Sequence, residues 1–330
     1  MKNFSYVRAT SVQEAVQQAS STPTALFIAG GTNLIDRMKV FLDEPSQLID
    51  ITRLGMTQIE QTGKGLRLGA LVSNTAVADH PEVRRNYPML SRAILLGASQ
   101  QIRNMATVGG NLLQRTRCPY YYDTAFACNK RQPGAGCAAI TGINRTHALF
   151  GASDQCVAVH PSDMCIPLAA LDAIVEVEGP KGNRQIPFGN FHRLPGTTPQ
   201  RDTNLEPGEL ITAIVLPPAP FAKSGVYLKL RDRASYAFAL VSVAAAVEIA
   251  DNRIKEARLA MGGMAHRPWR FPQAESFLMG KSANPETFQQ AAEIALQGAK
   301  PLAHNGFKVE LAKRAIRRAL AVAARGGGVV

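Results

Sequence analysis

The first fifty residues alternate between apolar and polar positions in a way that predicts a small α/β unit. Residues 11–19 have the apolar spacing of a helix and begin with a capping box. Short apolar runs at 25–29 and 48–51 are typical of buried strands. Between them, a pair of glycines precedes a second helical pattern at 34–41. The predicted order is helix, strand, glycine turn, helix, strand.

The middle of the chain passes from periodic to aperiodic sequence. Residues 66–71 alternate like a strand, and helical patterns follow at 74–79 and 88–97. From 115 to 155 no period is visible, and Cys, Gly, Tyr and Arg are frequent. A loop of this length is uncommon unless it is functional or held by something else. Apolar periodicity returns at 164–177.

The last third of the chain predicts a second, smaller unit. A turn-rich linker at 189–205 precedes it, and we expect this linker to cross the surface. Three prolines at 217, 218 and 220 mark the boundary. Beyond it we predict three strands and then two helices, at 226–230, 238–250, 254–261, 285–298 and 307–324.

Composition narrows the class of protein. The chain has 330 residues, 46% of them hydrophobic and 19% charged, which is ordinary for a globular protein. The net charge is +12, but the basic residues are spread along the chain without interleaved aromatic residues, so we expect no nucleic-acid partner. No apolar stretch is long enough for a membrane helix. The N-terminal segment lacks the apolar centre of a signal peptide, so we expect any export to depend on a partner.

Two glycine motifs are candidates for binding an extended anion. The first, Ile28-Ala29-Gly30-Gly31-Thr32-Asn33-Leu34, ends a predicted strand and begins a helix. Consecutive amide groups there could point into one concavity that suits a pyrophosphate, although the spacing is not that of a Rossmann fingerprint. The second, Thr107-Val108-Gly109-Gly110-Asn111, is predicted to offer further backbone N–H groups and a hydroxyl. Tight turns without any ligand remain the alternative for both.

Four of the five cysteines lie within a stretch of 39 residues: Cys118, Cys128, Cys137 and Cys156. Their spacers of 9, 8 and 18 residues match neither zinc-finger nor ferredoxin patterns. Four thiolates can hold a 4Fe–4S cluster, a 2Fe–2S cluster or zinc, and ligation would explain how an aperiodic segment stays ordered. Unligated thiols in a loose insertion are the alternative. Cys165 stands in an apolar run and is predicted to be a core thiol.

Two further motifs are weaker. His160-Pro161-Ser162-Asp163 precedes a buried element, where Ser162 and Asp163 could meet a cofactor hydroxyl or simply cap a helix. Lys229 and Arg231 share one face of a predicted strand. That face could meet an electron-poor ring or a phosphate, or it could be a solvated strand edge. No histidine or serine stands in a hydrolase motif.

In their order along the chain, these motifs resemble the medium, FAD-binding subunits of the xanthine dehydrogenase and carbon monoxide dehydrogenase family. The pieces that carry the resemblance are Ala-Gly-Gly-Thr-Asn (29–33), Ala-Thr-Val-Gly-Gly-Asn (106–111), His-Pro-Ser-Asp (160–163) and Lys-Leu-Arg-Asp (229–232). The cysteine segment resembles that of flavin and 4Fe–4S subunits of bacterial, periplasmic-type molybdenum aldehyde oxidoreductases. The flavin subunit of 4-hydroxybenzoyl-CoA reductase also carries a cysteine-bearing insertion.

The resemblance implies an α+β fold. We expect a two-lobed, PCMH-like α/β FAD-binding domain at 1–218, with lobes at about 1–55 and 56–218, and a smaller α+β domain at 219–330. The cysteine-bearing insertion lies at about 115–157. The residues expected to contact FAD are Ile28, Ala29, Gly30, Gly31, Thr32, Asn33, Leu34, Thr107, Gly110, Asn111, Asp163 and Lys229. The four clustered cysteines are expected to ligate a 4Fe–4S cluster, and no side chain is expected to act as a catalytic acid or base.

The function implied is that of an electron-transfer subunit in a molybdenum-dependent aldehyde oxidoreductase. Molybdopterin and 2Fe–2S clusters would reside in a large and a small partner subunit of a heterotrimer, and FAD would pass electrons to an external acceptor. A related molybdenum hydroxylase subunit of the 4-hydroxybenzoyl-CoA reductase or xanthine dehydrogenase type, a self-contained flavin oxidase and a zinc-stapled scaffold are the alternatives. The resemblance implies a periplasmic location, with the cytoplasm as the alternative.

Overall fold

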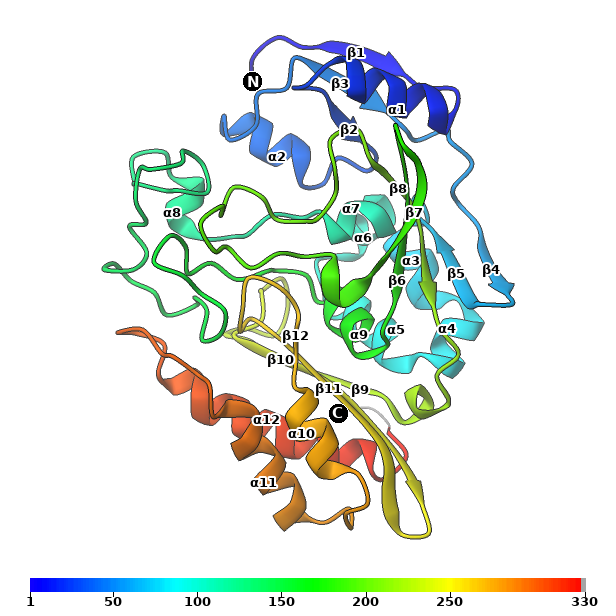
Figure 1. The fold of residues 1–330 in the computed structure, drawn as a ribbon, viewed down its shortest axis with the longest axis vertical. Coiled ribbons are helices and arrows are strands. Elements are labelled where there is room, and N and C mark those ends of the chain that lie inside the picture. The colour runs from blue at the N-terminus through cyan, green and yellow to red at the C-terminus, as the bar shows by residue number, and fades with distance from the viewer. Residues whose placement is uncertain (328–330) are drawn as a thin grey trace.

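The computed structural model describes residues 1–327 and arranges them as three sheets with helices packed between and around them (Figure 1). In chain order the elements are β1 (Ser5–Arg8), α1 (Val12–Ser21), β2 (Leu26–Ile28), α2 (Leu34–Lys39), β3 (Gln47–Asp50), β4 (Ile59–Thr62), β5 (Gly65–Gly69), α3 (Asn74–Asp79), α4 (Pro81–Asn86), α5 (Pro88–Leu95), α6 (Gln100–Met105), α7 (Val108–Leu112), α8 (Pro119–Tyr122), α9 (Cys165–Ala170), β6 (Ile174–Gly179), β7 (Gly182–Pro187), β8 (Leu210–Leu216), β9 (Val226–Leu230), β10 (Val241–Ala250), β11 (Arg253–Gly262), β12 (Trp269–Arg270), α10 (Pro272–Leu278), α11 (Pro285–Leu296) and α12 (Phe307–Ala323).

The N-terminal unit is a three-stranded parallel sheet in the order β1-β3-β2. Its central strand β3 is buried, and α1 packs against it through Ala15 and Val16. The predicted cap of α1 is present, because the Ser11 hydroxyl accepts the Glu14 amide at 3.1 Å and the Glu14 carboxylate accepts the Thr10 amide at 2.8 Å. This unit covers one end of the molecule in Figure 1.

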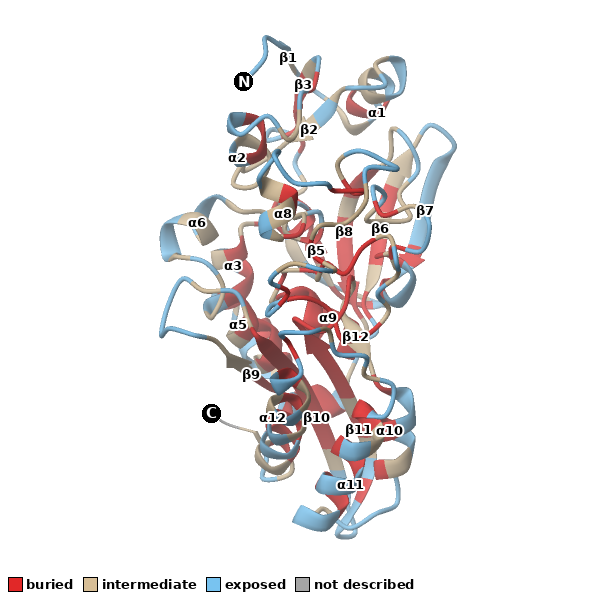
Figure 2. Ribbon diagram, turned by 90° about the vertical axis from the view of Figure 1, so that its left-hand side faces the viewer, coloured by how far each residue is buried: buried red, intermediate tan, exposed pale blue. Residues whose placement is uncertain are grey.

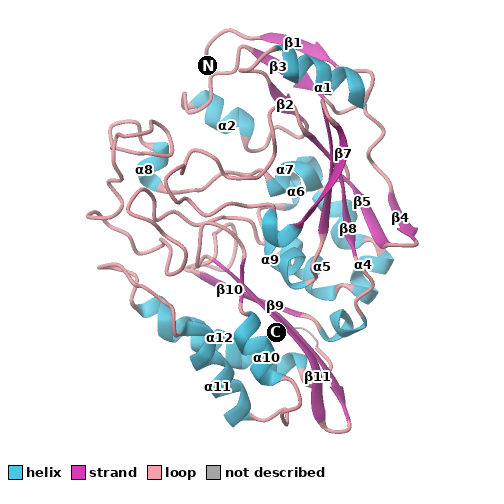
Figure 3. Ribbon diagram, in the orientation of Figure 1, coloured by secondary structure: helices cyan, strands magenta, loops and turns pink. Residues whose placement is uncertain are grey.

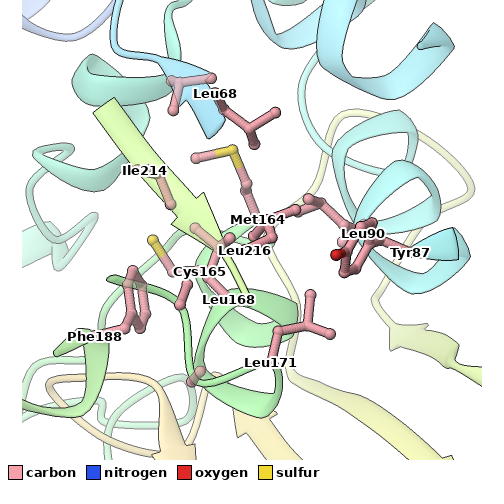
Figure 4. Packing of buried hydrophobic residues seen from close by; sticks show 14 of the residues in the cluster. Leu68, Tyr87, Leu90, Met164, Cys165, Leu168, Leu171, Phe188, Ile214 and Leu216 are labelled. Atoms are coloured by element: carbon pink, nitrogen blue, oxygen red, sulfur yellow. The ribbon is translucent and has the colours of Figure 1, made fainter. Parts of the chain in front are cut away.

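The central unit is a five-stranded antiparallel sheet in the order β4-β5-β8-β6-β7. Strand β8 follows the long linker and inserts between β5 and β6, so the chain returns to a sheet that it began much earlier. Residues such as Leu68, Ile214 and Leu168 pack into the core between this sheet, α5 and α9 (Figure 4). Most of the deeply buried residues lie in this layer and in the adjoining third sheet (Figure 2).

The C-terminal unit is a four-stranded antiparallel sheet in the order β12-β11-β10-β9, with α10 and α12 packed on one face and α11 packed against these two helices. Residues Ala244 and Ala246 of β10 point into the central core, and Val243 and Ala245 point toward the helices. Because both faces of β10 are covered, its first seven residues, 241–247, are all buried and its sequence does not alternate. The predicted Asp251-Asn252 turn is confirmed, with φ of 49° and 58° at the two residues.

Some predicted elements are wrong. The strand predicted at 238–250 begins only at Val241, because residues 231–240 form a loop beside a cavity. The second glycine motif is not a turn but the short helix α7. The linker at 189–205 is not a simple surface crossing, since Phe191 and His192 are buried. The division of the chain into domains at residue 218 stays a prediction.

The segment from 115 to 157 is almost entirely irregular, as its lack of periodicity predicts. Within it only α8 is helical, and its strand pairing is limited to single bridges such as Cys128 with Cys137 (Figure 3). The segment forms a lobe of loops beside the central unit (Figure 1). Within residues 1–327 the structure contains no helix that could span a membrane.

Candidate functional site

The main cavity of the described chain, about 600 Å³ in volume, is lined by residues of all three units. A volume of this size is typical of cofactor sites. All twelve residues for which we predicted cofactor contact line it: Ile28, Ala29, Gly30, Gly31, Thr32, Asn33, Leu34, Thr107, Gly110, Asn111, Asp163 and Lys229. The structure therefore brings residues from distant parts of the sequence to one place. Their contact with a cofactor stays a prediction.

The first glycine motif supplies unused hydrogen-bond donors to this cavity. The amides of residues 30–34 donate to no protein acceptor in the described structure. Gly31 adopts a φ of 69°, which turns the chain so that successive amides face one side. Gly30 lies against α6, where a Cβ atom would stand 1.8 Å from the carbonyl oxygen of Met105. The result is a concave row of donors that fits a phosphate or pyrophosphate.

The second glycine motif does not supply such donors, contrary to our expectation. The amides of Val108 and Gly109 bond to the carbonyls of Val72 and Ala70, at 2.9 and 2.8 Å. The amide of Gly110 bonds to the Thr107 hydroxyl at 3.3 Å, which caps α7. The motif therefore lines the cavity with its glycines and with the side chains of Thr107 and Asn111. The amides from 108 to 110 form hydrogen bonds within the protein.

Two asparagines position the cavity wall. The side-chain oxygen of Asn33 accepts the amide of Arg115 at 3.1 Å and the guanidinium of Arg37 at 3.2 Å, and its Nδ2 is buried without a partner. The side-chain oxygen of Asn111 accepts the hydroxyl of Ser162 at 2.6 Å. Ser162 also accepts the Cys165 amide at 3.1 Å at the start of α9, so the helix-capping alternative for this serine is confirmed.

Asp163 and Lys229 form a buried ion pair at the cavity wall. The Lys229 ammonium donates to Asp163 at 2.8 Å and to the carbonyl of Leu96 at 3.0 Å, while Tyr227 donates to the other Asp163 oxygen at 2.6 Å. Burial raises the pKa of Asp163, and the charge of Lys229 opposes that shift. Arg231 donates to the same Leu96 carbonyl at 3.2 Å, which confirms that Lys229 and Arg231 share a face of β9. Both side chains already have hydrogen-bond partners within the protein, so a bond from either to a cofactor hydroxyl would be formed in addition to these.

Several cavity residues escaped the sequence analysis. Arg103 holds the loop after α5 by donating to the carbonyl of Gly97 at 2.8 Å, and Ala98 in that loop has a φ of 50°. Tyr236 and Phe238 reach the cavity from the loop between β9 and β10. None of these residues stands in a short motif, and only the tertiary fold brings them to the cavity.

The four clustered cysteines surround a second, smaller hollow. Main-chain bonds from Asn129 to Gly136 (2.7 Å) and from Ala138 to Ala127 (3.1 Å) join the stretches that carry Cys128 and Cys137. The Asn129 side chain reaches the Gln155 carbonyl at 3.1 Å, next to Cys156. The structure thus brings together four cysteines with irregular sequence spacing.

The distances between these sulfurs bear on the ligand. Among the described residues, no three of the four sulfur atoms lie within 4.8 Å of one another. Four thiolates on one zinc, with Zn–S bonds of ~2.3 Å, would stand about 3.8 Å apart. Burial raises the pKa of Cys118 to about 12 and that of Cys156 to about 11, so ligation must displace their protons.

Asp202 connects the cysteine segment to the main cavity. Its carboxylate pairs with Arg115 at 2.7 Å and with Lys130, whose side chain is only 1% exposed. Lys130 also donates to the carbonyl of Pro199 at 2.7 Å. These cations hold the pKa of Asp202 below its usual range in spite of its burial. Because Asp202 lines the main cavity and Lys130 lines the cysteine hollow, this ion pair links the walls of the two sites.

A buried trio of His160, Cys165 and His192 lies beneath the same cavity, with ligand atoms within 4.8 Å of one another. Cys165 is fully buried, as predicted. The Ser162 amide donates to Nδ1 of His160 at 3.3 Å, and Nε2 of His192 faces the Leu112 carbonyl at 2.9 Å. The proton of neutral His160 therefore sits on Nε2, the atom that a metal would need. Burial keeps both rings neutral, lowering the pKa of His192 to about 4.

The fold and the cavity are those of a flavoprotein subunit of the molybdenum hydroxylase class, and the chain belongs to the family of FAD-binding medium subunits of that class. Residues 2–219 match the FAD binding domain in molybdopterin dehydrogenase, and residues 226–323 match the CO dehydrogenase flavoprotein C-terminal domain. It is accordingly an FAD-dependent oxidoreductase subunit.

Among its relatives, the chain is 50% identical to the aldehyde oxidoreductase FAD-binding subunit PaoB of Escherichia coli K12, over 98% of this chain and 99% of the relative. It is 29% identical to the glyceraldehyde dehydrogenase medium chain of Sulfolobus acidocaldarius, over 92% and 91% of the two chains. The solved structure of quinoline 2-oxidoreductase from Pseudomonas putida 86 superimposes with a TM-score of 0.76 at 27% identity, covering 99% of each chain.

Proposed function

We propose that this chain binds FAD in the main cavity and a 4Fe–4S cluster on its four cysteines, and that it serves as the electron-transfer subunit of a molybdenum-dependent aldehyde oxidoreductase. The observation that carries the proposal is the pairing of two sites in one domain. A row of unpartnered amides at 30–34 suits the cofactor's phosphates, and a cage of four thiols is linked to the main cavity by the Lys130–Asp202 pair. The 50% identity to an aldehyde oxidoreductase subunit supports the substrate class.

Among the described residues the four thiols do not form a preassembled zinc site, since no three of their sulfurs lie within 4.8 Å of one another. A four-iron cluster places each thiolate on a different iron, so its sulfurs stand farther apart than four thiolates on one zinc. Cys118, Cys128, Cys137 and Cys156 would hold the cluster. Arg115 and Lys130 lie nearby and offset part of its negative charge.

The chain's own residues bind and enclose the cofactor, and they perform no acid–base chemistry in this proposal. The flavin, when bound, accepts electrons and releases them to an outside acceptor. The amides of 30–34 hold the phosphates, and the Asp163–Lys229 pair fixes the wall between α5 and β9. No histidine in the described cavity is placed to move a substrate proton, since His160 and His192 are buried and neutral.

The proposed partners are a large subunit with the molybdenum cofactor and a small subunit with 2Fe–2S clusters. The names of the relatives, FAD-binding subunit and medium chain, support membership of a larger complex. Beyond the four-cysteine cage, the described residues contain no second set of cysteines that could hold an iron–sulfur cluster. Electrons would therefore enter from a partner. We also propose a periplasmic location for the complex, to be tested by fractionating cells and assaying each fraction.

The test is a visible spectrum of the purified complex with counts of flavin, iron and zinc. We expect one FAD per chain and four irons beyond those of the partner subunit. Cys128→Ser should remove the four irons and leave FAD bound, whereas the control Cys165→Ala should keep both. One zinc in place of the irons would reject the cluster, and absence of FAD would reject the flavin function.

A further inference from the structure

His147 lies next to a proposed cluster ligand and has no role in the function described so far. It is buried, with 2% of its surface exposed, and its Nε2 stands 3.2 Å from the sulfur of Cys118. Its ring also lies near Tyr120, with centroids 6.2 Å apart. His147 belongs to the cysteine segment, but it was not singled out by any sequence pattern.

The backbone of His147 is fixed from the C-terminal unit. Its carbonyl accepts Asn305 Nδ2 at 3.2 Å and Lys308 Nζ at 2.8 Å, and both of these residues are fully buried. Its amide donates to Asn144 at 3.1 Å. The main chain that carries the ring is therefore held beside Cys118 by residues at and just before the start of α12.

The protonation of the ring follows from its surroundings. Its Nδ1 is buried without a partner, and its Nε2 faces sulfur. A thiolate on iron can only accept a hydrogen bond, so with the cluster present the proton resides on Nε2.

We infer that His147 is a positioning residue of the proposed cluster, whose Nε2–H donates to the Cys118 thiolate and raises the reduction potential of the cluster. Hydrogen bonds to ligating sulfurs draw off negative charge and favour the reduced state. The Tyr121 amide donates to the carbonyl of Cys118 at 3.0 Å, so the first turn of α8 fixes the main chain of this cysteine. This inference rests on the proposed cluster.

The first test compares His147→Leu with His147→Gln in the intact complex. Leucine removes the donor, whereas the glutamine amide can replace it. We expect redox titration followed by EPR to give a more negative potential for this cluster in the leucine variant and a near-normal one in the glutamine variant. The signals of FAD and of the partner's clusters should not shift. Equal potentials in wild type and both variants, with iron retained, would overturn the inference.

The second test uses the unmodified protein, so it does not depend on the stability of a variant. In complex labelled with ¹⁵N-histidine, pulsed EPR of the reduced cluster should show one weak ¹⁵N coupling and one exchangeable proton. A strong coupling would mean that His147 ligates iron itself, and no coupling would mean that no hydrogen bond exists; either result overturns the inference. Absence of iron from wild type would instead overturn the proposed function.

Discussion

Gly30 stands where β2 turns toward α2, and the carbonyl of Met105 occupies the space that any side chain would need. The contact brings the row of free amides against α6 and closes one side of the cavity. Packing therefore requires a glycine at position 30, whereas the φ of 69° requires one at position 31.

Replacing Gly30 by alanine should push the 30–34 segment away from α6 and weaken FAD binding. A backbone clash of this kind costs roughly 1–3 kcal/mol, which corresponds to about 5- to 150-fold in affinity. The measurement is FAD per chain after dialysis, from the flavin absorbance of denatured protein. Gly63→Ala is the control, since a Cβ there meets nothing within 4 Å. Full FAD retention in Gly30→Ala would contradict the assignment of this wall.

Asp202→Asn should destabilise the protein, because it leaves the buried Lys130 ammonium without its counter-charge. Breaking such a pair costs roughly 3–5 kcal/mol. The folded-state pKa of Asp202 lies below its usual value of 3.8, so its stabilisation is present at neutral pH and is lost as the pH falls below about 4.

Urea unfolding of the complex between pH 3 and 7 tests this, and the variant should lose part of the acid dependence of the wild type. Asp232→Asn is the matched control, because Asp232 is 60% exposed in its pair with Arg145. That exposed pair is screened by solvent and should contribute little to stability. Equal unfolding free energies for both variants would contradict the role of Asp202.

At this scale, the sequence allowed prediction of residues whose chemistry is local. Glycines at a strand end and cysteines in a polar, aperiodic segment can be recognised without neighbours. Asp202 pairs with Lys130, 72 positions earlier, and His147 contacts Cys118, 29 positions earlier. Arg103 holds Gly97 in a loop before its own helix. No local sequence pattern marks such pairs.

Among the elements, α12 does more than cover the C-terminal sheet. Its second residue, Lys308, is fully buried and donates to the carbonyls of His147 and Gly263. The start of the helix thereby fastens the cysteine segment to the C-terminal unit.

Lys308 should also give the protein a distinctive pH dependence. Burial lowers its pKa to about 7 from 10.5, so the unfolded chain binds more protons than the folded chain between these values. Stability should therefore rise with pH in that window, by up to about 1.4 kcal/mol per pH unit from this group. In Lys308→Met the rise should be smaller by that amount, and in the control Lys313→Met it should be unchanged. Parallel curves for wild type and Lys308→Met, from urea unfolding between pH 7 and 10, would contradict this.

The loop between β9 and β10 is held over the cavity by the cysteine segment. Arg145 makes two bonds of 2.9 Å to Asp232, and the Arg117 guanidinium lies 5.4 Å from the ring centre of Phe238. Arg117→Ala should free Phe238 and speed FAD release severalfold, since a cation–π contact contributes roughly 0.5–2 kcal/mol. Stopped-flow measurement of the rise in flavin fluorescence on release gives the rate, and Arg84→Ala, at an exposed arginine outside the cysteine segment, is the control. An unchanged rate would mean that the loop does not retain FAD.

The elements also show why prediction from the sequence failed in places. Helices α3 and α11 have one buried face each and were predicted to within two residues. The start of β10 was predicted three residues too early, because the apolar Phe238 lines the cavity and is not part of the strand. The continuously apolar β8 was missed, since central strands lack the alternation that identifies a half-buried one.

At the scale of the whole molecule, the cavity lies between three units and is lined by residues of each. A ligand there touches the N-terminal unit through residues 30–34, the central unit through Asn111 and the C-terminal unit through Lys229. Its binding energy therefore adds to the cohesion of all three.

Removal of FAD should lower the thermal stability of the complex, and added FAD should restore it in a concentration-dependent way. At 100 times its dissociation constant a ligand contributes about 2.7 kcal/mol. Differential scanning calorimetry of stripped and reloaded complex measures this. A melting temperature that does not respond to FAD would show that the cavity is closed by protein contacts alone.

The bonds from Asn305 and Lys308 to the backbone of residues 147 and 148 have a consequence for how this protein can change. A shortened variant that lacks the cysteine lobe would leave the Lys308 ammonium and the Asn305 side-chain amide without these carbonyl acceptors. Trimming the lobe therefore calls for apolar replacements on α12 in the same step, and relatives built without the lobe should have no lysine at that position.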